Sequence, residues 1–294
     1  MWSHHSHSGQ YCSHASDQLE QIIQRAIEMG FTTYCLTEHV PRDRQEDLYP
    51  EEAHLIPSDL YDIFDKYYKH AKVLQTKYKN IIKLLVGFET DYIHGESFDL
   101  IARLRKQYHF DMFVGSIHHV RSIPIDFDHV LWNKAESACG GLEGLYEEYF
   151  DTQYAMLQRL EPPIVGHFDL IKLKSPDHTI PLTRFPSVWQ GVIRNINFIA
   201  EYGGMMEINS AALRKGWEVP YPSGEVTDYA RTQNVKFCLS DDSHGLAQVG
   251  SNYGQMISYL KDQNIETIHY MSTEGDDIKC FSLPVHQLTV PKMV

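Results

Sequence analysis

The 294-residue sequence predicts a closed α/β barrel built from seven strand–helix units. Strand-like and helix-like hydrophobic periods alternate along the chain, which is typical of a parallel sheet with helical crossovers. Seven short apolar runs also end in His, Glu, Asp or Asn, at residues 2–7, 34–39, 85–89, 113–118, 164–167, 206–209 and 237–244. Because the carboxyl ends of barrel strands converge, side chains far apart in the sequence can meet there in one pocket.

The first helix follows a polar segment, and capping signals predict its boundaries. Asp17 fits the N-cap position, with Glu20 three residues later as in a capping box. Apolar side chains at helical spacing run through residues 19–27. Gly30 fits the position just after the last turn, where a left-handed backbone is common.

The later units are placed by the same alternation of periods. Helices are expected over residues 58–78, 98–107, 142–160, 185–202 and 225–233. Strands are expected over residues 31–36, 81–88, 110–117, 164–166, 204–208 and 235–239. No internal repeat or interdomain linker separates these units, so we expect a single domain over residues 1–294.

Three stretches interrupt the alternation, at residues 41–57, 121–141 and 172–186. They contain prolines and many polar residues, and each follows a strand that ends in an expected ligand. Such a position suits a substrate loop over the pocket, and it suits a plain surface insertion equally well.

Composition argues against several classes of protein. The formal net charge of −13 disfavours nucleic-acid binding, because phosphate contacts require clustered Lys and Arg. No stretch approaches the roughly 20 apolar residues of a membrane span, and the polar N-terminus is unlike a signal peptide. The five cysteines are odd in number and lack Cys-x-x-Cys spacing. This usage favours a reducing compartment, so we expect a cytoplasmic protein, and its oligomeric state is left open.

The N-terminus carries a His-x-His pair at His5 and His7. Residues two apart in an extended chain point to the same face, so both imidazoles can reach one ion, whereas His4 faces the other way. His14 follows just before the first helix, and a tight loop would bring it near the pair. Imidazole combined with carboxylate suits zinc, iron or manganese.

Motifs spread over almost the whole chain resemble the polymerase and histidinol phosphatase (PHP) superfamily. They occur in this order: His5-Ser6-His7, Cys12-Ser13-His14-Ala15, Thr37-Glu38-His39, Gly87-Phe88-Glu89, Gly115-Ser116-Ile117-His118, Gly166-His167-Phe168-Asp169 and Ser240-Asp241-Asp242-Ser243-His244. The Cys-x-His-Ala element and residues 207–214 and 220–223 are similar to the histidinol-phosphatase branch, and the opening strings are particularly similar to its fungal members. The resemblance implies a distorted (β/α)7 TIM-like barrel with a metal site at the carboxyl ends of the strands.

The resemblance also implies two to three divalent ions, which would be zinc, iron or manganese. The implied ligands are His5, His7, Glu89 and Asp242 for the first ion, His14, His39 and His244 for the second, and Glu89 again with His118 and His167 for the third. Motif register favours His118 over His119 and Asp242 over Asp241. The spacing from His7 to His14 is one residue longer than in many bacterial relatives.

The expected chemistry is the hydrolysis of a phosphomonoester by a metal-activated water. The groups expected to act in catalysis are Asp242, His244 and Glu89. The groups expected to bind the substrate are Arg214, Lys172 and Asn209, with Arg214 making a bidentate contact to phosphate. Glu38 is a weaker candidate for proton transfer. The imidazole and amine of histidinol need acidic or polar partners, for which Glu207 or Asp43 could serve, and the sequence does not choose between them.

The resemblance therefore implies a phosphoric monoester hydrolase that converts L-histidinol phosphate to L-histidinol and phosphate in histidine biosynthesis. One alternative is another PHP phosphoesterase that acts on a nucleotide or another small phosphomonoester. A second alternative is an inactive, metal-binding regulatory protein. Intact motifs at every strand end argue against the inactive protein, and the acidic composition argues against a nucleic-acid substrate.

Overall fold

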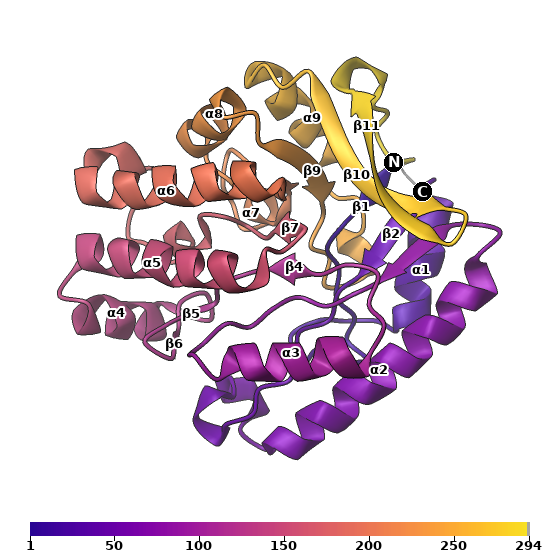
Figure 1. The fold of residues 1–294 in the computed structure, drawn as a ribbon, viewed down its shortest axis with the longest axis horizontal. Helices are drawn as coiled ribbons and strands as arrows, with labels where there is room; N and C mark the ends of the chain where they lie inside the picture. Colours follow the sequence, from indigo (N-terminus) through magenta and orange to yellow (C-terminus); the bar gives the residue numbers. More distant parts are fainter. Residues whose placement is uncertain (293–294) are drawn as a thin grey trace.

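The computed structural model describes residues 1–292 as a mixed α/β protein in which helices surround short central strands (Figure 1). The strands are β1 Trp2–Ser3, β2 Thr33–Leu36, β3 Lys83–Val86, β4 Val114–Gly115, β5 His119–Val120, β6 Ile123–Pro124, β7 Ile164–Val165, β8 Met205–Asn209, β9 Lys236–Ser240, β10 Thr267–Glu274 and β11 Asp277–Pro284. The helices are α1 Leu19–Glu28, α2 Pro57–Tyr78, α3 Ser97–Gln107, α4 His129–Ala138, α5 Leu142–Leu160, α6 Pro186–Tyr202, α7 Ala211–Arg214, α8 Gly224–Thr232 and α9 Tyr253–Asp262.

The parallel strands form two sheets, so the expected closed barrel is not confirmed. One sheet has the order β1-β2-β3 and the other β4-β7-β8-β9, with every pair parallel. Single parallel bridges link the two sheets, between Glu89 and Val114 at one seam and between Ser6 and Ser243 at the other. Very short strands explain the interruption, because β1 and β4 contribute two residues each. Close approach at the first seam requires Gly87, where an added Cβ would lie 2.4 Å from the carbonyl oxygen of Met112.

The expected helices are present with boundaries close to those predicted. The helix α5 begins and ends at the predicted residues, and α2, α3, α6 and α8 each shift by one residue at one or both ends. Their apolar stripes pack into one large buried cluster that runs from Trp2 to Val285. Among the described residues, no helix is long and apolar enough to cross a membrane.

The start of α1 was predicted incorrectly. Gln18 is the N-cap residue, and its backbone N–H donates to the Gln21 side chain at 3.0 Å. Asp17 instead has a φ of +68°, and its carboxylate accepts from the backbone N–H of Leu246 at 2.8 Å. A contact with a distant loop therefore outweighs the local capping preference. Gly30, with a φ of +85°, follows the helix end as predicted.

Several elements were not predicted. A β5–β6 hairpin begins just before the stretch 121–141, and the stretch itself contains β6 and α4. The Asp128 side chain caps α4 by accepting from Leu131 N at 2.7 Å. The helix α9 and the antiparallel β10–β11 hairpin follow the last predicted strand. Met271 and Ile278 of this hairpin pack against a small apolar cluster between the parallel strands. This cluster is formed by Cys35, Leu85, Met112, Val114, Ile164, Met205 and Cys238.

Candidate metal centre

Imidazoles and carboxylates meet at the carboxyl ends of the parallel strands. His5 and His7 follow β1, Glu89 follows β3 and Asp242 follows β9. The Nε2 atoms of His5 and His7 lie 3.1 Å and 3.3 Å from Oε2 of Glu89, and 3.8 Å and 3.7 Å from Oδ1 of Asp242. All four side chains are buried. The structure therefore brings together the whole group expected at the first ion.

The two oxygens of Glu89 face different groups of histidines. Its Oε1 lies 2.9 Å from Nε2 of His167 and 3.3 Å from Nε2 of His118, whereas its Oε2 lies near His5, His7 and His39. A carboxylate can bridge two cations when each oxygen serves one of them. The arrangement fits the bridging position expected for Glu89.

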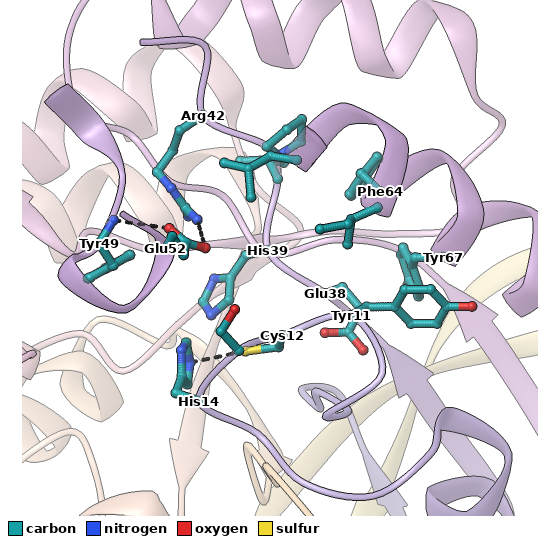
Figure 2. A pocket seen from close by; sticks show the side chains of 15 residues that line it. Tyr11, Cys12, His14, Glu38, His39, Arg42, Tyr49, Glu52, Phe64 and Tyr67 are labelled. Atoms are coloured by element: carbon teal, nitrogen blue, oxygen red, sulfur yellow. Dashed lines mark hydrogen bonds and ion pairs between the residues drawn. The ribbon is translucent and has the colours of Figure 1, made fainter. Parts of the chain in front are cut away.

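The group expected at the second ion, formed by His14, His39 and His244, is more exposed to solvent. The His14 ring centroid lies 5.4 Å from that of His39 and 5.0 Å from that of His244. Its side chain is 40% exposed, and its Nδ1 lies 2.8 Å from Oε1 of Glu51. Figure 2 shows His14 and His39 on the wall of a small pocket, with the Cys12 side chain in contact with His14. The expected second set of ligands is thus gathered, with His14 at its outer edge.

Several buried ring nitrogens in this cluster form no hydrogen bond with any of residues 1–292, although most of them lie near carboxylate oxygens. They are His5 Nε2, both ring nitrogens of His7 and both ring nitrogens of His39. A buried polar atom without a partner costs about 1–3 kcal/mol, and such atoms usually have a protein, water or ion partner. Divalent cations are suitable partners because they accept neutral imidazole as a ligand. The residues present therefore fit a metal centre.

The carboxylates of the cluster are held in their ionised form. Burial raises the pKa of Glu89, but the nearby His5, His118 and His39 outweigh it and hold that pKa well below its usual range. Burial likewise opposes ionisation of Asp242, and His5, His244 and His7 together lower its pKa well below the ordinary value. Ionised carboxylates are the form that binds cations.

The geometry separates the members of each ambiguous pair. Asp241 faces away from the cluster, accepting from Ser3 Oγ and from Gly250 N, both at 2.7 Å. Burial raises the Asp241 pKa to about 6. Asp242 adopts a φ of +47°, a backbone conformation uncommon for a non-glycine residue, and its carboxylate faces the histidines.

The same separation applies to the two adjacent histidines. Nε2 of His118 approaches Glu89, whereas His119 packs its ring 5.2 Å from that of Tyr49 and has no contact to Glu89 among the described residues. His4 is also outside the cluster, because its ring contacts the Leu239 carbonyl and the Met271 N–H. These positions agree with the predicted choices.

Three buried acidic residues hold the predicted ligand side chains, and the sequence did not predict this role. Glu207 contacts His5 Nδ1 at 3.2 Å and accepts from the His167 backbone N–H at 2.7 Å. Asp91 contacts His118 Nδ1 at 3.0 Å. Glu38 accepts from Ser8 Oγ at 2.6 Å and lies 3.6 Å from His7 Nδ1. Such partners fix the orientation and tautomer of ligating imidazoles.

The structure places neither of the two carboxylates considered for the histidinol imidazole and amine in the wall of the cavity. Glu207 is buried beneath the histidines, with its oxygens engaged by His5, His167 and Asn209. Asp43 lies 3.7 Å from Arg103 and is not among the described residues that line the cavity at the metal centre. Neither carboxylate therefore faces a ligand in that cavity.

The expected substrate-binding residues occupy different environments. Arg214 lines the cavity, but its guanidinium also donates to the main-chain carbonyls of Asp241 and Asp242. Asn209 is buried, and its amide donates to Glu207 at 2.7 Å and to Asp242 at 3.3 Å. Lys172 is buried and is absent from the cavity lining within residues 1–292. Of the three, Arg214 alone is available to a molecule in the cavity.

A cavity of about 500 Å³ opens above the cluster. Its outer wall includes Tyr49 and Glu51 from the stretch 41–57, and Asp126 and Phe127 from the stretch 121–141. The stretch 172–186, which the structure describes in full, contributes no residue to the lining of this cavity. Two of the three insertions thus form the outer wall of the cavity.

Comparisons with known proteins agree with this architecture. Residues 3–211 match the PHP domain. The chain is 48% identical over 277 residues to a candidate histidinol-phosphatase of Schizosaccharomyces pombe, covering 94% of this chain and 90% of that protein. It is 36% identical to the histidinol-phosphatase of Saccharomyces cerevisiae, covering 92% of this chain and 91% of that protein.

A solved structure has the same fold. The histidinol phosphate phosphatase of Lactococcus lactis, crystallised with zinc, L-histidinol and phosphate, superposes with a TM-score of 0.68 at 18% identity, covering 95% of this chain and 98% of that chain. The family match extends over most of the chain, and the fungal relatives cover nearly all of it. The chain belongs to the PHP-domain family.

Proposed function

We propose that this chain is a metal-dependent phosphomonoesterase that hydrolyses L-histidinol phosphate to L-histidinol and phosphate. The observation that carries the proposal is the convergence of Glu89 and the eight other predicted ligand side chains at the strand ends, below a cavity of about 500 Å³. The names of the fungal relatives and the ligands of the Lactococcus lactis enzyme support this substrate.

The proposed ligand sets are those predicted from the sequence. His5, His7, Glu89 and Asp242 would hold one ion, His14, His39 and His244 a second, and Glu89, His118 and His167 a third. When bound, divalent ions in such a site polarise phosphoryl oxygens and lower the pKa of a bound water. Zinc, iron and manganese all accept this combination of imidazole and carboxylate. The two short sheets would act together as a distorted seven-stranded barrel in one domain, and its strand ends would hold the ligands.

Around such a site, the remaining residues would orient ligands and move protons. His244 Nδ1 lies 2.9 Å from the Asp242 carbonyl oxygen, which leaves Nε2 available to the site. Asp242 and His244 are the proposed groups for proton transfer to the leaving alkoxide. Glu89 would link the sets of ligands, since each of its oxygens faces a different group of histidines.

The cavity wall supplies charges of both signs for the substrate. Arg214 and Lys215 line one part of it, and fixed positive charge stabilises a phosphate dianion. Glu51 and Asp126 line another part, where they suit the ammonium and imidazolium groups of histidinol phosphate. The Tyr49 and Phe127 rings, with centroids 6.1 Å apart, offer an aromatic surface for the imidazole. Lys172 is a secondary candidate for binding the substrate phosphate, after Arg214.

The test is phosphate release from a substrate panel. Purified protein should release phosphate fastest from L-histidinol phosphate, and more slowly from nucleoside monophosphates and p-nitrophenyl phosphate. Removal of bound metal by a chelator should abolish release, and added zinc or manganese should restore it. Equal rates on all substrates would reject the proposed specificity, and full activity in chelator would reject the metal-dependent mechanism.

A further inference from the structure

We propose that the sulfur of Cys12 is an additional metal ligand, joined to the set of His14, His39 and His244. The inference rests on the proposed metal-dependent function and adds a soft ligand to it. The Cys12 Sγ and one ring nitrogen from each of His7, His39 and His244 all lie within 4.8 Å of one another. The Cys12 sulfur, His39 and His244 are therefore close enough to share one ion, with His7 of the neighbouring set beside them.

The fourth histidine is close to the same sulfur. His14 Nε2 lies 3.2 Å from Cys12 Sγ, and Figure 2 shows this contact beside the His39 ring. Within the part of the chain that the structure describes, both ring nitrogens of the buried His7 and both of His39 form no hydrogen bond. Buried nitrogens without a hydrogen bond, next to the sulfur, indicate that the imidazoles and the thiol bind a common metal ion, and not merely one another.

A tight loop fixes the position of the sulfur. The Cys12 backbone N–H donates to the Ser8 carbonyl at 2.9 Å, and the Gly9 N–H donates to the Ser16 carbonyl at 3.0 Å. The loop closes so tightly that a Cβ on Gly9 would lie 2.7 Å from the Ser16 backbone. The Cys12 side chain is buried and forms no disulfide. The sulfur is therefore held toward the histidines.

A thiolate changes which ions the site prefers. Imidazole and thiolate together select zinc or iron(II), whereas manganese and magnesium prefer oxygen ligands. Ligation of the sulfur displaces the thiol proton, which passes to solvent while the ion gains the sulfur bond. Cys12 would thus give one position of the cluster a preference for zinc that a set of histidines and carboxylates alone does not provide.

Cobalt(II) is the probe for this proposal, because a cobalt–thiolate bond adds a near-ultraviolet charge-transfer absorption. The full chain is stripped of metal, loaded with cobalt and scanned. We expect this absorption in the wild type and in Cys139→Ser, whose thiol lies at the end of α4, and we expect Cys12→Ser to lose it. Absence of the absorption in the cobalt-loaded wild type, or its persistence in Cys12→Ser, would overturn the proposal.

A second measurement covers the case in which Cys12→Ser folds poorly. In the wild type, zinc should protect Cys12 from alkylation by iodoacetamide, as mapped by peptide mass spectrometry of the folded protein, whereas magnesium should not. Equal labelling with both ions would reject ligation. Histidinol phosphate hydrolysis by zinc-loaded wild type is scored separately. If the protein hydrolyses histidinol phosphate but lacks the cobalt–thiolate absorption, only the proposed ligation by Cys12 is rejected. If it shows the absorption but does not hydrolyse histidinol phosphate, only the proposed function is rejected.

Discussion

The floor and the outer wall of the cavity are built differently. The floor consists of buried side chains at strand ends, such as His5 and Glu89, and its ligands are oriented by buried partners such as Glu207. The wall consists of residues from inserted segments, such as Glu51, whose side chain is 27% exposed, and Asp126. The floor can therefore hold a fixed geometry for the chemistry, while the wall determines what the cavity accepts.

The difference has an energetic basis. Buried charges destabilise a fold unless they are paired, so the floor maintains its carboxylates through several imidazoles each. Charges on the wall remain partly hydrated, and each of their contacts contributes about 1 kcal/mol or less. Substitutions in the floor should thus reduce catalysis itself, whereas substitutions in the wall should change substrate affinity.

The largest expected effect is at Asp242. Asp242→Asn removes the negative charge that faces His5 and His7, and we expect kcat/KM on L-histidinol phosphate to fall by more than about 100-fold. Asp241→Asn changes a carboxyl that faces Ser3 and Gly250, so the folded fraction should retain most of its activity. Equal losses of activity in the two variants, measured per folded molecule, would show that Asp241 belongs to the cavity floor as much as Asp242 does.

The second expected effect separates two adjacent histidines. His118→Ala removes an imidazole 3.3 Å from Glu89 and should cost roughly 100-fold in kcat/KM, with lower metal content. His119→Ala removes a ring that packs near Tyr49 and should mainly raise KM. Elemental analysis together with steady-state kinetics measures both quantities, and the reverse ranking would contradict the assignment of His118 to the floor.

A third prediction concerns Glu207, a buried residue that holds predicted ligands and does not line the described cavity. Glu207→Gln weakens the partner of His5 Nδ1 and should lower metal affinity by about 10- to 100-fold. Excess metal should then restore much of kcat, because Glu207 lies outside the cavity lining. Metal titration of activity distinguishes this role. A loss of kcat that no metal concentration reverses would instead indicate direct contact with the substrate.

The sequence predicted much of the cavity floor, but it predicted few of the buried residues that hold the floor side chains in place. Residues such as His39 and His167 were found because strand ends converge in parallel α/β folds, whatever the details of packing. Glu207 had a usable signal, since it is an acidic residue inside the apolar run of β8, where an ionised group requires a partner. Its partner is His5, about 200 residues earlier, and no local pattern encodes that pairing.

The fold shows the same division between local and distant information. The long helices were predicted well because their apolar stripes repeat over many turns, as in α5. The β10–β11 hairpin was missed, although Gly275 between two alternating runs is a hairpin signal. The Asp17 cap failed because the loop at Leu246 binds its carboxylate. Closure of the barrel was overestimated because two-residue strands leave its seams joined by single bridges.

Arg214 lies where floor and wall meet, and its expected effect is intermediate. Arg214→Ala would remove the proposed charge-assisted contact to phosphate, worth about 1.5–3 kcal/mol, so kcat/KM should fall about 10- to 100-fold. It also removes two hydrogen bonds to the main chain at Asp241 and Asp242. Arg214→Lys should recover only part of the loss, because an ammonium lacks the planar fork. If Arg214→Ala keeps a near wild-type kcat/KM, the phosphate must be bound by another cation, with Lys215 or Lys172 the next candidate.

The smallest expected effect tests the wall directly. Asp126→Asn keeps the shape of a side chain that lines the cavity but removes its charge, so KM for L-histidinol phosphate should rise by up to about 5-fold while kcat stays unchanged. KM for p-nitrophenyl phosphate, which carries no ammonium group, should stay constant. Asp128→Asn is the matched control, because it removes a charge from the same segment while asparagine still caps α4. If both variants raise KM equally, the wall attracts substrate through its general charge, and Asp126 makes no specific contact with the cationic end of histidinol phosphate.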